Sequence, residues 1–205
     1  MVIGKWNKSV VLTYIGLAFS ILGMYFAITG KDILLSFGCL ILSGVCDMFD
    51  GKIARMCKRN QEEIEFGIEL DSLVDVVCFV VFPIIIYLSL GFTAWYNLIS
   101  YILFAICGIA RLGYFNVCTA TKDGKIVKYF EGLPVTVAAI TFPLFYLLSN
   151  IMPKSAFHIL YSILIVMEAI LNILKIKVKK LTGIFYLILS ICAAIMLAIY
   201  AVLLW

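Results

Sequence analysis

The sequence predicts an all-α protein that crosses a membrane several times, and two observations lead to this fold class. Of the 205 residues, 64% are hydrophobic and only 14% are charged, and the mean hydropathy is +1.13, which is unlike an ordinary soluble domain. The apolar residues also form continuous runs of about 20, the length that a helix needs to cross a bilayer. Because these runs do not alternate with polar residues, as strands of a membrane barrel do, they indicate helices.

Seven apolar runs follow one another, and each is expected to be a membrane-spanning helix. The connections between them are short, so we expect a single integral membrane domain over residues 1–205. The fifth run carries Pro134 in its first turn, where proline is tolerated, and Pro143 in its interior, which predicts a kink. The expected spans are about Val10–Thr29, Ile33–Arg55, Gly67–Leu90, Ala94–Val117, Leu133–Leu148, Ala156–Leu174 and Leu181–Leu204.

The first run is expected to be a retained span, because it is long for a signal peptide and lacks a clear small-residue cleavage site. The seven cysteines include no CxxC pair, and most lie inside apolar runs. Cysteine in such a place behaves as a small hydrophobic packing residue. His158 is the single histidine of the chain, so we expect it to be structural.

Basic residues are distributed unevenly between the two sides of the predicted bundle. Thirteen of the 16 Lys and Arg residues fall on the side that holds the N-terminus. By the positive-inside rule this side is cytoplasmic, which places Trp205 on the outer side of the cell membrane. Lysines beside lipid headgroups explain the net charge of +4, so no nucleic-acid partner is expected. The thirteen are Lys5, Lys8, Lys52, Arg55, Lys58, Arg59, Lys122, Lys125, Lys128, Lys175, Lys177, Lys179 and Lys180.

Four aspartates occur where the second and third spans approach the cytoplasmic side. At about 100° per residue, Asp47 and Asp50 share one helix face with Ala54. Gly51 and Arg55 lie at the edge of that face. Single interfacial aspartates are common at helix ends, but this stripe is matched by a second one on the next span.

The second stripe consists of Gly67, Asp71 and Asp75, which share one face of the third span. The loop between the two spans has about ten residues, so the helices are expected to be antiparallel neighbours whose four carboxylates converge. Like charges at close range repel unless cations lie between them. Oxygen ligands without cysteine or histidine favour a hard divalent cation over zinc. Two such cations suit phosphoryl chemistry.

These stripes resemble the signature of the CDP-alcohol phosphotransferases. The pattern is Asp-x-x-Asp-Gly-x-x-Ala-Arg over 47–55 and, after eleven residues, Gly-x-x-x-Asp-x-x-x-Asp over 67–75. All eight fixed positions are present. The resemblance implies a six-helix bundle, to which the span 181–204 adds one C-terminal transmembrane helix, and it implies a homodimer.

The resemblance also implies a reaction, in which a hydroxyl attacks the β-phosphate of a CDP-linked lipid and CMP leaves. Asp75 would take the proton from the hydroxyl, a plausible task for a carboxylate near metals. Arg55 would contact phosphate, which suits its guanidinium group. The ligands of two divalent cations, Mg²⁺ or Mn²⁺, would be Asp47, Asp50, Asp71 and Asp75. The nucleotide site would be formed by Thr13, Gly51, Ala54, Arg55 and Gly67.

Two further segments, ARLGYFNV at 110–117 and EGLPVTVAA at 131–139, resemble the phosphatidylserine synthase branch of that family. They imply CDP-diacylglycerol, a membrane lipid, as the donor and L-serine as the acceptor. An arginine inside a span usually faces a cavity or a partner, and serine brings a carboxylate. Arg111 and Asn116 are therefore candidate serine ligands. A structural pair of Arg111 with Glu168 is the alternative.

Three other functions are compatible with parts of the pattern. An acceptor such as glycerol 3-phosphate or inositol phosphate would need several converging arginines, and the chain has three, Arg55, Arg59 and Arg111. A cation-coupled transporter would place its site near the midplane, at broken helices. A non-catalytic scaffold would be expected to lack a signature position, and none is missing.

Overall fold

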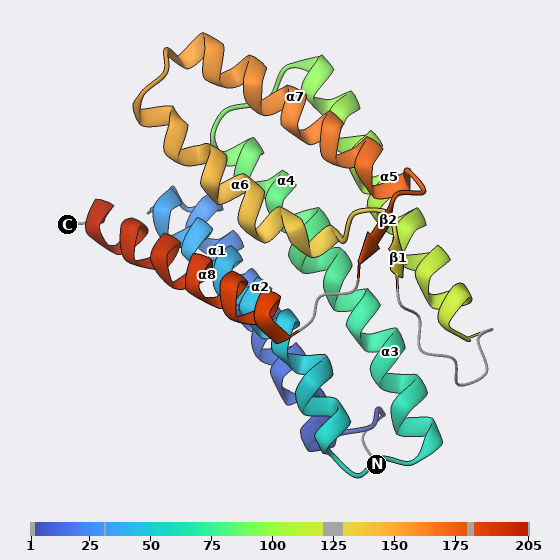
Figure 1. Ribbon diagram of the computed structural model, residues 1–205. Coiled ribbons are helices and arrows are strands. Elements are labelled where there is room, and N and C mark those ends of the chain that lie inside the picture. The colour runs from blue at the N-terminus through green and yellow to red at the C-terminus, as the bar shows by residue number, and fades with distance from the viewer. Residues whose placement is uncertain (1–2, 31, 121–128, 180–182, 205) are drawn as a thin grey trace.

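The computed structural model describes residues 3–30, 32–120, 129–179 and 183–204 (Figure 1). Within these ranges five helical segments are long and apolar enough to cross a membrane, and two shorter apolar helices accompany them. The predicted all-α membrane fold is confirmed. Of the residues discussed above, Lys122, Lys125, Lys128, Lys180, Leu181 and Trp205 lie outside the described ranges. The helices are α1 (Val11–Ile28), α2 (Ile33–Met56), α3 (Gln61–Asp75), α4 (Phe82–Ser89), α5 (Trp95–Ala120), α6 (Ala138–Tyr146), α7 (Lys154–Ile173) and α8 (Gly183–Leu203).

Helix α3, which begins the third predicted span, starts at Gln61, ahead of the predicted start at Gly67. Asn60 and Glu63 form a capping box there: Glu63 N–H donates to Asn60 Oδ1, and Asn60 N–H donates to Glu63 Oε2, each at 2.9 Å. This reciprocal cap satisfies two backbone donors of the first turn. Polar residues can therefore extend the helix beyond the apolar run from which its start was predicted.

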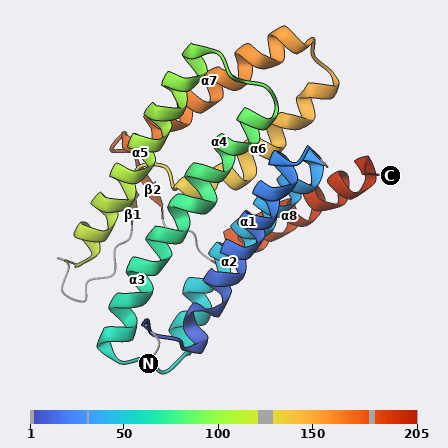
Figure 2. The same ribbon diagram turned by 180° about the vertical axis from the view of Figure 1, so that it is seen from behind.

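A π-helix over Val76–Val81 joins α3 to α4 without a break, so that 61–89 is one rod (Figure 2). Within it, Phe82 N–H donates to the carbonyl of Val77, five residues back. Pro83 follows at once and has no N–H, and its ring crowds the preceding turn of a regular helix. A wider turn at this point relieves that crowding.

Small residues bring α1 and α2 into close contact. Ser20 Oγ donates to Ser43 Oγ at 3.0 Å, and Ser36 Oγ donates to the carbonyl of Gly23 at 2.8 Å. A Cβ atom at Gly23 would lie 2.7 Å from Cβ of Cys39, closer than carbon atoms pack. Small residues with interhelical hydrogen bonds are a common way of joining membrane helices. This contact positions the start of α1 beside the aspartates of α2.

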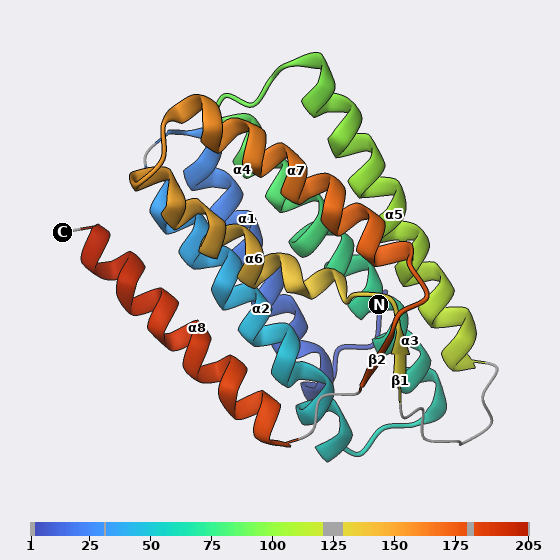
Figure 3. The same cartoon turned by 45° about the horizontal axis from the view of Figure 1, so that its top comes forward.

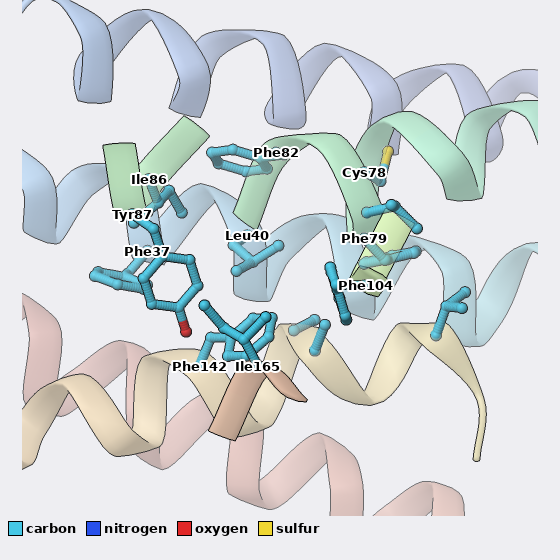
Figure 4. Packing of buried hydrophobic residues seen from close by; sticks show 14 of the residues in the cluster. Phe37, Leu40, Cys78, Phe79, Phe82, Ile86, Tyr87, Phe104, Phe142 and Ile165 are labelled. Carbon is cyan, nitrogen blue, oxygen red and sulfur yellow. The ribbon is translucent and has the colours of Figure 1, made fainter. Parts of the chain in front are cut away.

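The core lies where α2, α4, α6 and α7 meet. Figure 4 shows Phe37, Tyr87 and Phe142 pointing toward one another from three of these helices. The rings of Tyr87 and Phe142 pack edge to face, with centroids 5.2 Å apart, an arrangement that aromatic pairs favour. This aromatic layer joins the three helices in the core.

The last helix, α8, packs against α2 and α6, outside the other helices (Figure 3). Tyr200 OH donates to the carbonyl of Pro143 at 2.8 Å. Pro143 lies inside α6, as the sequence places it. α8 is therefore a peripheral addition that contributes none of the residues predicted for the site.

Two short strands, β1 (Tyr129–Glu131) and β2 (Lys177–Lys179), form an antiparallel ladder that the sequence did not predict. Gly132 follows β1 with φ of 81°, a conformation that favours glycine. A Cβ atom there would lie 2.6 Å from the carbonyl oxygen of Asn172. The ladder thus holds the segment before α6 against the end of α7.

Candidate active site

The structure brings the carboxylates of the two aspartate stripes together. Asp47, Asp71 and Asp75 each present a carboxylate oxygen, and these oxygens all lie within 4.8 Å of one another. Asp47 faces Asp75, and Asp50 faces Asp71. The antiparallel arrangement of α2 and α3 produces this convergence, since each helix carries its two aspartates on one face.

A narrow pocket lies between α1, α2 and the rod that begins with α3, and all four aspartates line it. Gly16 and Ser43 line its α1–α2 side and leave room there, and Val74 and Phe79 give it an apolar wall. Apolar surroundings strengthen every electrostatic interaction inside such a site. The pocket is suited to a small, highly charged group.

Thr13 enters the site from α1 and contacts an aspartate directly. Its Oγ1 donates to Oδ2 of Asp50 at 2.9 Å, and both side chains are buried. The sequence suggested a nucleotide contact for Thr13. In the structure its hydroxyl holds one of the predicted metal ligands.

The two signature glycines lie beneath guanidinium groups. A Cβ atom at Gly51 would lie 3.7 Å from Nη1 of Arg55, and one at Gly67 would lie 3.6 Å from Nη1 of Arg59. Ala54 lies half-buried beside them. Arg59 was not among the predicted site residues, because it falls outside the signature. The cluster of basic residues at 52–59 was the signal that could have found it.

Arg111 reaches the site from α5. It lies close enough to Asp75 and Asp47 for their charges to interact. Its guanidinium stands over the ring of Phe115, 5.7 Å from the centroid. In the described part of the chain its Nε atom is buried without a hydrogen-bond partner, which is unusual for a buried donor and leaves it able to bind a ligand.

Asn116 contacts a residue that the sequence reasoning missed. Ser72, which follows Asp71 on α3, donates from Oγ to Oδ1 of Asn116 at 3.0 Å. Both side chains are half-buried. This contact joins the aspartate helix to the helix that carries Arg111.

Glu168 does not reach Arg111. It is buried in α7 and accepts a hydrogen bond from Thr141 Oγ1 of α6. The ion pair found among the described residues joins Lys5 and Glu62 at 2.5 Å, near the N-terminus, and does not involve Glu168. Arg111 therefore has the aspartates, and not Glu168, as its charged neighbours.

The sequence profile of CDP-alcohol phosphatidyltransferases matches residues 6–205, nearly the whole chain. The protein belongs to the CDP-alcohol phosphatidyltransferase family. The family membership predicted from the two aspartate stripes is therefore confirmed.

Several curated relatives are named as enzymes that transfer a lipid phosphatidyl group to serine or make a serine lipid. The chain is 44% identical over 101 residues to CDP-diacylglycerol–serine O-phosphatidyltransferase of Saccharomyces cerevisiae, which covers 46% of this chain and 35% of that protein. It is 37% identical over 130 residues to archaetidylserine synthase of Methanothermobacter thermautotrophicus, covering 62% of this chain and 53% of that one. It is 34% identical over 163 residues to CDP-diacylglycerol–serine O-phosphatidyltransferase of Methanocaldococcus jannaschii, covering 78% and 73%. The matched stretch thus spans about a third to a half of the first two relatives.

CDP-alcohol phosphatidyltransferases generally use divalent metals, and the acidic cluster fits such ions. The ligand atoms that lie together are carboxylate oxygens, which hard cations such as Mg²⁺ and Mn²⁺ prefer. Three carboxylates this close need a balancing positive charge. The residues present therefore suit a divalent cation in both charge and ligand type.

Proposed function

We propose that the protein transfers the phosphatidyl group of CDP-diacylglycerol to the hydroxyl of L-serine, forming phosphatidylserine and releasing CMP. The observation that carries this proposal is the position of Arg111: its buried Nε has no hydrogen-bond partner among the described residues, and its charge lies near the aspartate cluster. The relatives support serine as the acceptor, since two are named for phosphatidyl transfer to serine and one for archaetidylserine synthesis.

The donor is bound on the side of the site formed by α1, α2 and the C-terminal half of α3. Four aspartates, Asp47, Asp50, Asp71 and Asp75, would hold two divalent cations, Mg²⁺ or Mn²⁺. When bound, these cations neutralise the pyrophosphate and stabilise the charge that develops on it. Arg55 lies over Gly51 and would bind a phosphate oxygen.

The nucleotide lies over the small residues at the cytoplasmic ends of α2 and α3. Gly51 and Gly67 have no side chain, and a guanidinium nitrogen lies 3.6–3.7 Å from the position of each missing Cβ atom. Ala54 carries only a methyl group. A flat base fits such a surface, and a larger side chain at any of the three positions would fill it.

Asp75 acts as the general base. It is buried at the inner end of the pocket and shares the cluster with Asp47. The serine oxygen attacks the phosphorus that carries the diacylglycerol, and its proton passes to the carboxylate of Asp75. The bond from that phosphorus to the bridging oxygen breaks, and CMP leaves with that oxygen.

Arg111 orients the acceptor by binding the serine carboxylate. Acceptors that carry a phosphate in its place would need more positive charge. The other two arginines of the chain, Arg55 and Arg59, lie over the glycines on the donor side. This distribution favours an acceptor with one carboxylate over glycerol 3-phosphate or inositol phosphate.

The protein is an integral membrane protein by its family and its helices. We propose that its site faces the cytoplasm, because basic residues are concentrated at that end of the bundle. The N-terminal segment lies at the same end, where Lys5 pairs with Glu62. We also propose that the protein is a homodimer, which the family resemblance implies.

A CMP-release assay tests the function. Purified protein in mixed micelles receives CDP-diacylglycerol and Mn²⁺ with L-serine, glycerol 3-phosphate or inositol phosphate in turn. The expected result is CMP release with serine alone. Absence of CMP with every acceptor would overturn the enzyme proposal, and release with a phosphate-bearing acceptor would overturn the choice of serine.

Arg111→Gln tests the acceptor site, and Glu168→Gln is its control. Loss of one charge-assisted contact should raise the KM for serine about tenfold or more, because such hydrogen bonds contribute about 1.5–3 kcal/mol. The metal dependence should not change. Glu168→Gln should leave the KM for serine unchanged, because Glu168 contacts Thr141 and not Arg111.

A further inference from the structure

A side-chain hydrogen bond joins α3 to the C-terminal part of α5. Ser72 Oγ donates to Asn116 Oδ1 at 3.0 Å. Ser72 lies between Asp71 and Asp75 in the signature, but its side chain does not line the aspartate pocket. It contacts the neighbouring helix, so its role differs from that of the residues on either side of it.

The position of α5 decides where Arg111 lies. α5 packs mainly along α7, and it meets the rod 61–89 at the π-helix and, over a short stretch near the site, at α3. Arg111 is five residues before Asn116, about 7.5 Å along the helix axis. Its Nε has no protein partner in the described part of the chain, and its guanidinium rests over Phe115 of its own helix. Its distance from Asp75 therefore depends on how α5 is held against α3.

We propose that Ser72 is a positioning residue for the acceptor. Its hydrogen bond to Asn116 holds α5, and with it Arg111, at a set distance from Asp75. This inference rests on the proposed function of the site. The carboxylate of serine and its hydroxyl oxygen are separated by a fixed number of bonds. One acceptor length therefore fits between the guanidinium of Arg111 and the carboxylate of Asp75.

The consequence is selectivity for acceptor length. With the bond present, α5 cannot move outward, and a hydroxy-amino acid with one more carbon, such as L-homoserine, places its hydroxyl beyond the reacting phosphorus. Without the bond, the serine hydroxyl is held less accurately and the longer acceptor is excluded less strongly. The donor site includes Asp71 and Asp75 of α3, but Ser72 itself does not line their pocket, so the loss of this contact should affect the acceptor more than the donor.

Ser72→Thr and Ser72→Val form the matched pair of variants that tests this. The two side chains have nearly the same shape, and threonine keeps the hydroxyl that valine lacks. Ser72→Val should raise the KM for serine about 3- to 10-fold, the range expected for one interhelical hydrogen bond in a membrane protein. The KM for CDP-diacylglycerol and the Mn²⁺ dependence should stay within twofold of the parent values. The preference for serine over homoserine should fall, and Ser72→Thr should retain it.

Two further variants separate positioning from general stability. Ser100→Ala, also on α5, removes a hydroxyl that donates to the carbonyl of Tyr96 in its own helix, and should change no kinetic constant. In a double-mutant cycle, Ser72→Val should add nothing to the effect of Asn116→Ala, because the first change has already removed the contact.

The inference is overturned if Ser72→Val leaves the KM for serine and the homoserine preference unchanged while the parent protein is active. It is overturned equally if the KM values of both substrates rise together, or if Ser72→Val and Ser72→Thr both fail to fold, since the bond would then be structural. A parent protein that releases no CMP with any acceptor would overturn the proposed function itself, and this inference with it.

Discussion

Thr13 on α1 donates a hydrogen bond from Oγ1 to Oδ2 of Asp50 on α2 at 2.9 Å. Both side chains are buried, with 7% and 6% of their surface exposed. The bond engages one of the two oxygens of the carboxylate. It also links the first helix of the chain to the acidic cluster, so that α1 helps to orient a predicted metal ligand.

Thr13→Val should weaken catalysis while the protein stays folded. A hydrogen bond to a charged group contributes about 1.5–3 kcal/mol, so kcat/KM in the CMP-release assay should fall about tenfold or more. Half-saturation by Mn²⁺ should shift to higher concentration, because Asp50 is held less firmly. Thr29→Val is the control, since Thr29 donates to the carbonyl of Tyr25 at the far end of the same helix. Equal effects of the two variants would contradict this role of Thr13.

Asp75→Asn should reduce kcat at least 100-fold, because general-base catalysis typically contributes about 10²–10⁴-fold. Single-turnover CMP release measures this loss. Asp32→Asn makes the same chemical change at the start of α2, where Asp32 Oδ1 accepts from Leu34 N–H at 2.8 Å. Asparagine caps helices as well as aspartate does, so this control should keep full activity. Residual activity near that of the parent in Asp75→Asn would exclude the base.

Divalent cations should stabilise the protein. Asp71→Asn should be more stable than the parent without cations and less stable than the parent with them. In chelator, the close carboxylates repel one another, so replacing one by a neutral amide should raise the melting temperature. A cation at 100 times its Kd stabilises the folded state by about 2.7 kcal/mol, and the variant should lose most of that gain. Melting curves of the parent and the variant in detergent, first with EDTA and then with Mn²⁺, measure which protein is more stable in each condition. An unchanged order would mean that Asp71 binds no cation.

Gly44→Ala should destabilise the contact between α2 and α6. A Cβ atom at Gly44 would lie 2.6 Å from Cβ of Ala139, and one at Gly38, on the same helix, would have nothing within 4 Å. Overpacking of this kind costs about 1–3 kcal/mol, whereas Gly38→Ala should be neutral or slightly stabilising. The two melting temperatures should therefore move in opposite directions or differ by several degrees. Equal melting temperatures would show that α6 can move away without cost.

The fold and the acidic cluster could be predicted because each depends on a regular period along the chain. Runs of apolar residues gave the spans, since lipid demands continuous helices. A rotation of about 100° per residue placed Asp47 beside Asp50 and Asp71 beside Asp75. The structure has these residues on facing helices.

The remaining features depend on contacts between distant residues, which no period reveals. Ser72 and Asn116 are 44 positions apart in the chain, and Arg59 reaches Gly67 only because the loop folds back. The strands at 129–131 and 177–179 pair two connections that look like ordinary polar loops. The early start of α3 at Gln61 was missed because its cap is polar, and the spans were predicted from apolar runs.

The π-helix at Val76–Val81 lies between two parts of one rod whose side chains must face different surroundings. Before it, Asp71 and Asp75 must face the pocket; after it, Phe82 and Ile86 must face the core, where both are fully buried (Figure 4). A regular helix through this point would shift the phase of all later residues by about 100°. In a regular helix the aspartates and the core residues of this rod could not face their partners at the same time, and the extra residue in the wide turn allows both to do so. Removing one residue within the turn would allow a regular helix that keeps both halves in their present orientation, whereas a regular helix through the full sequence would turn either the aspartates or the core residues away from their partners.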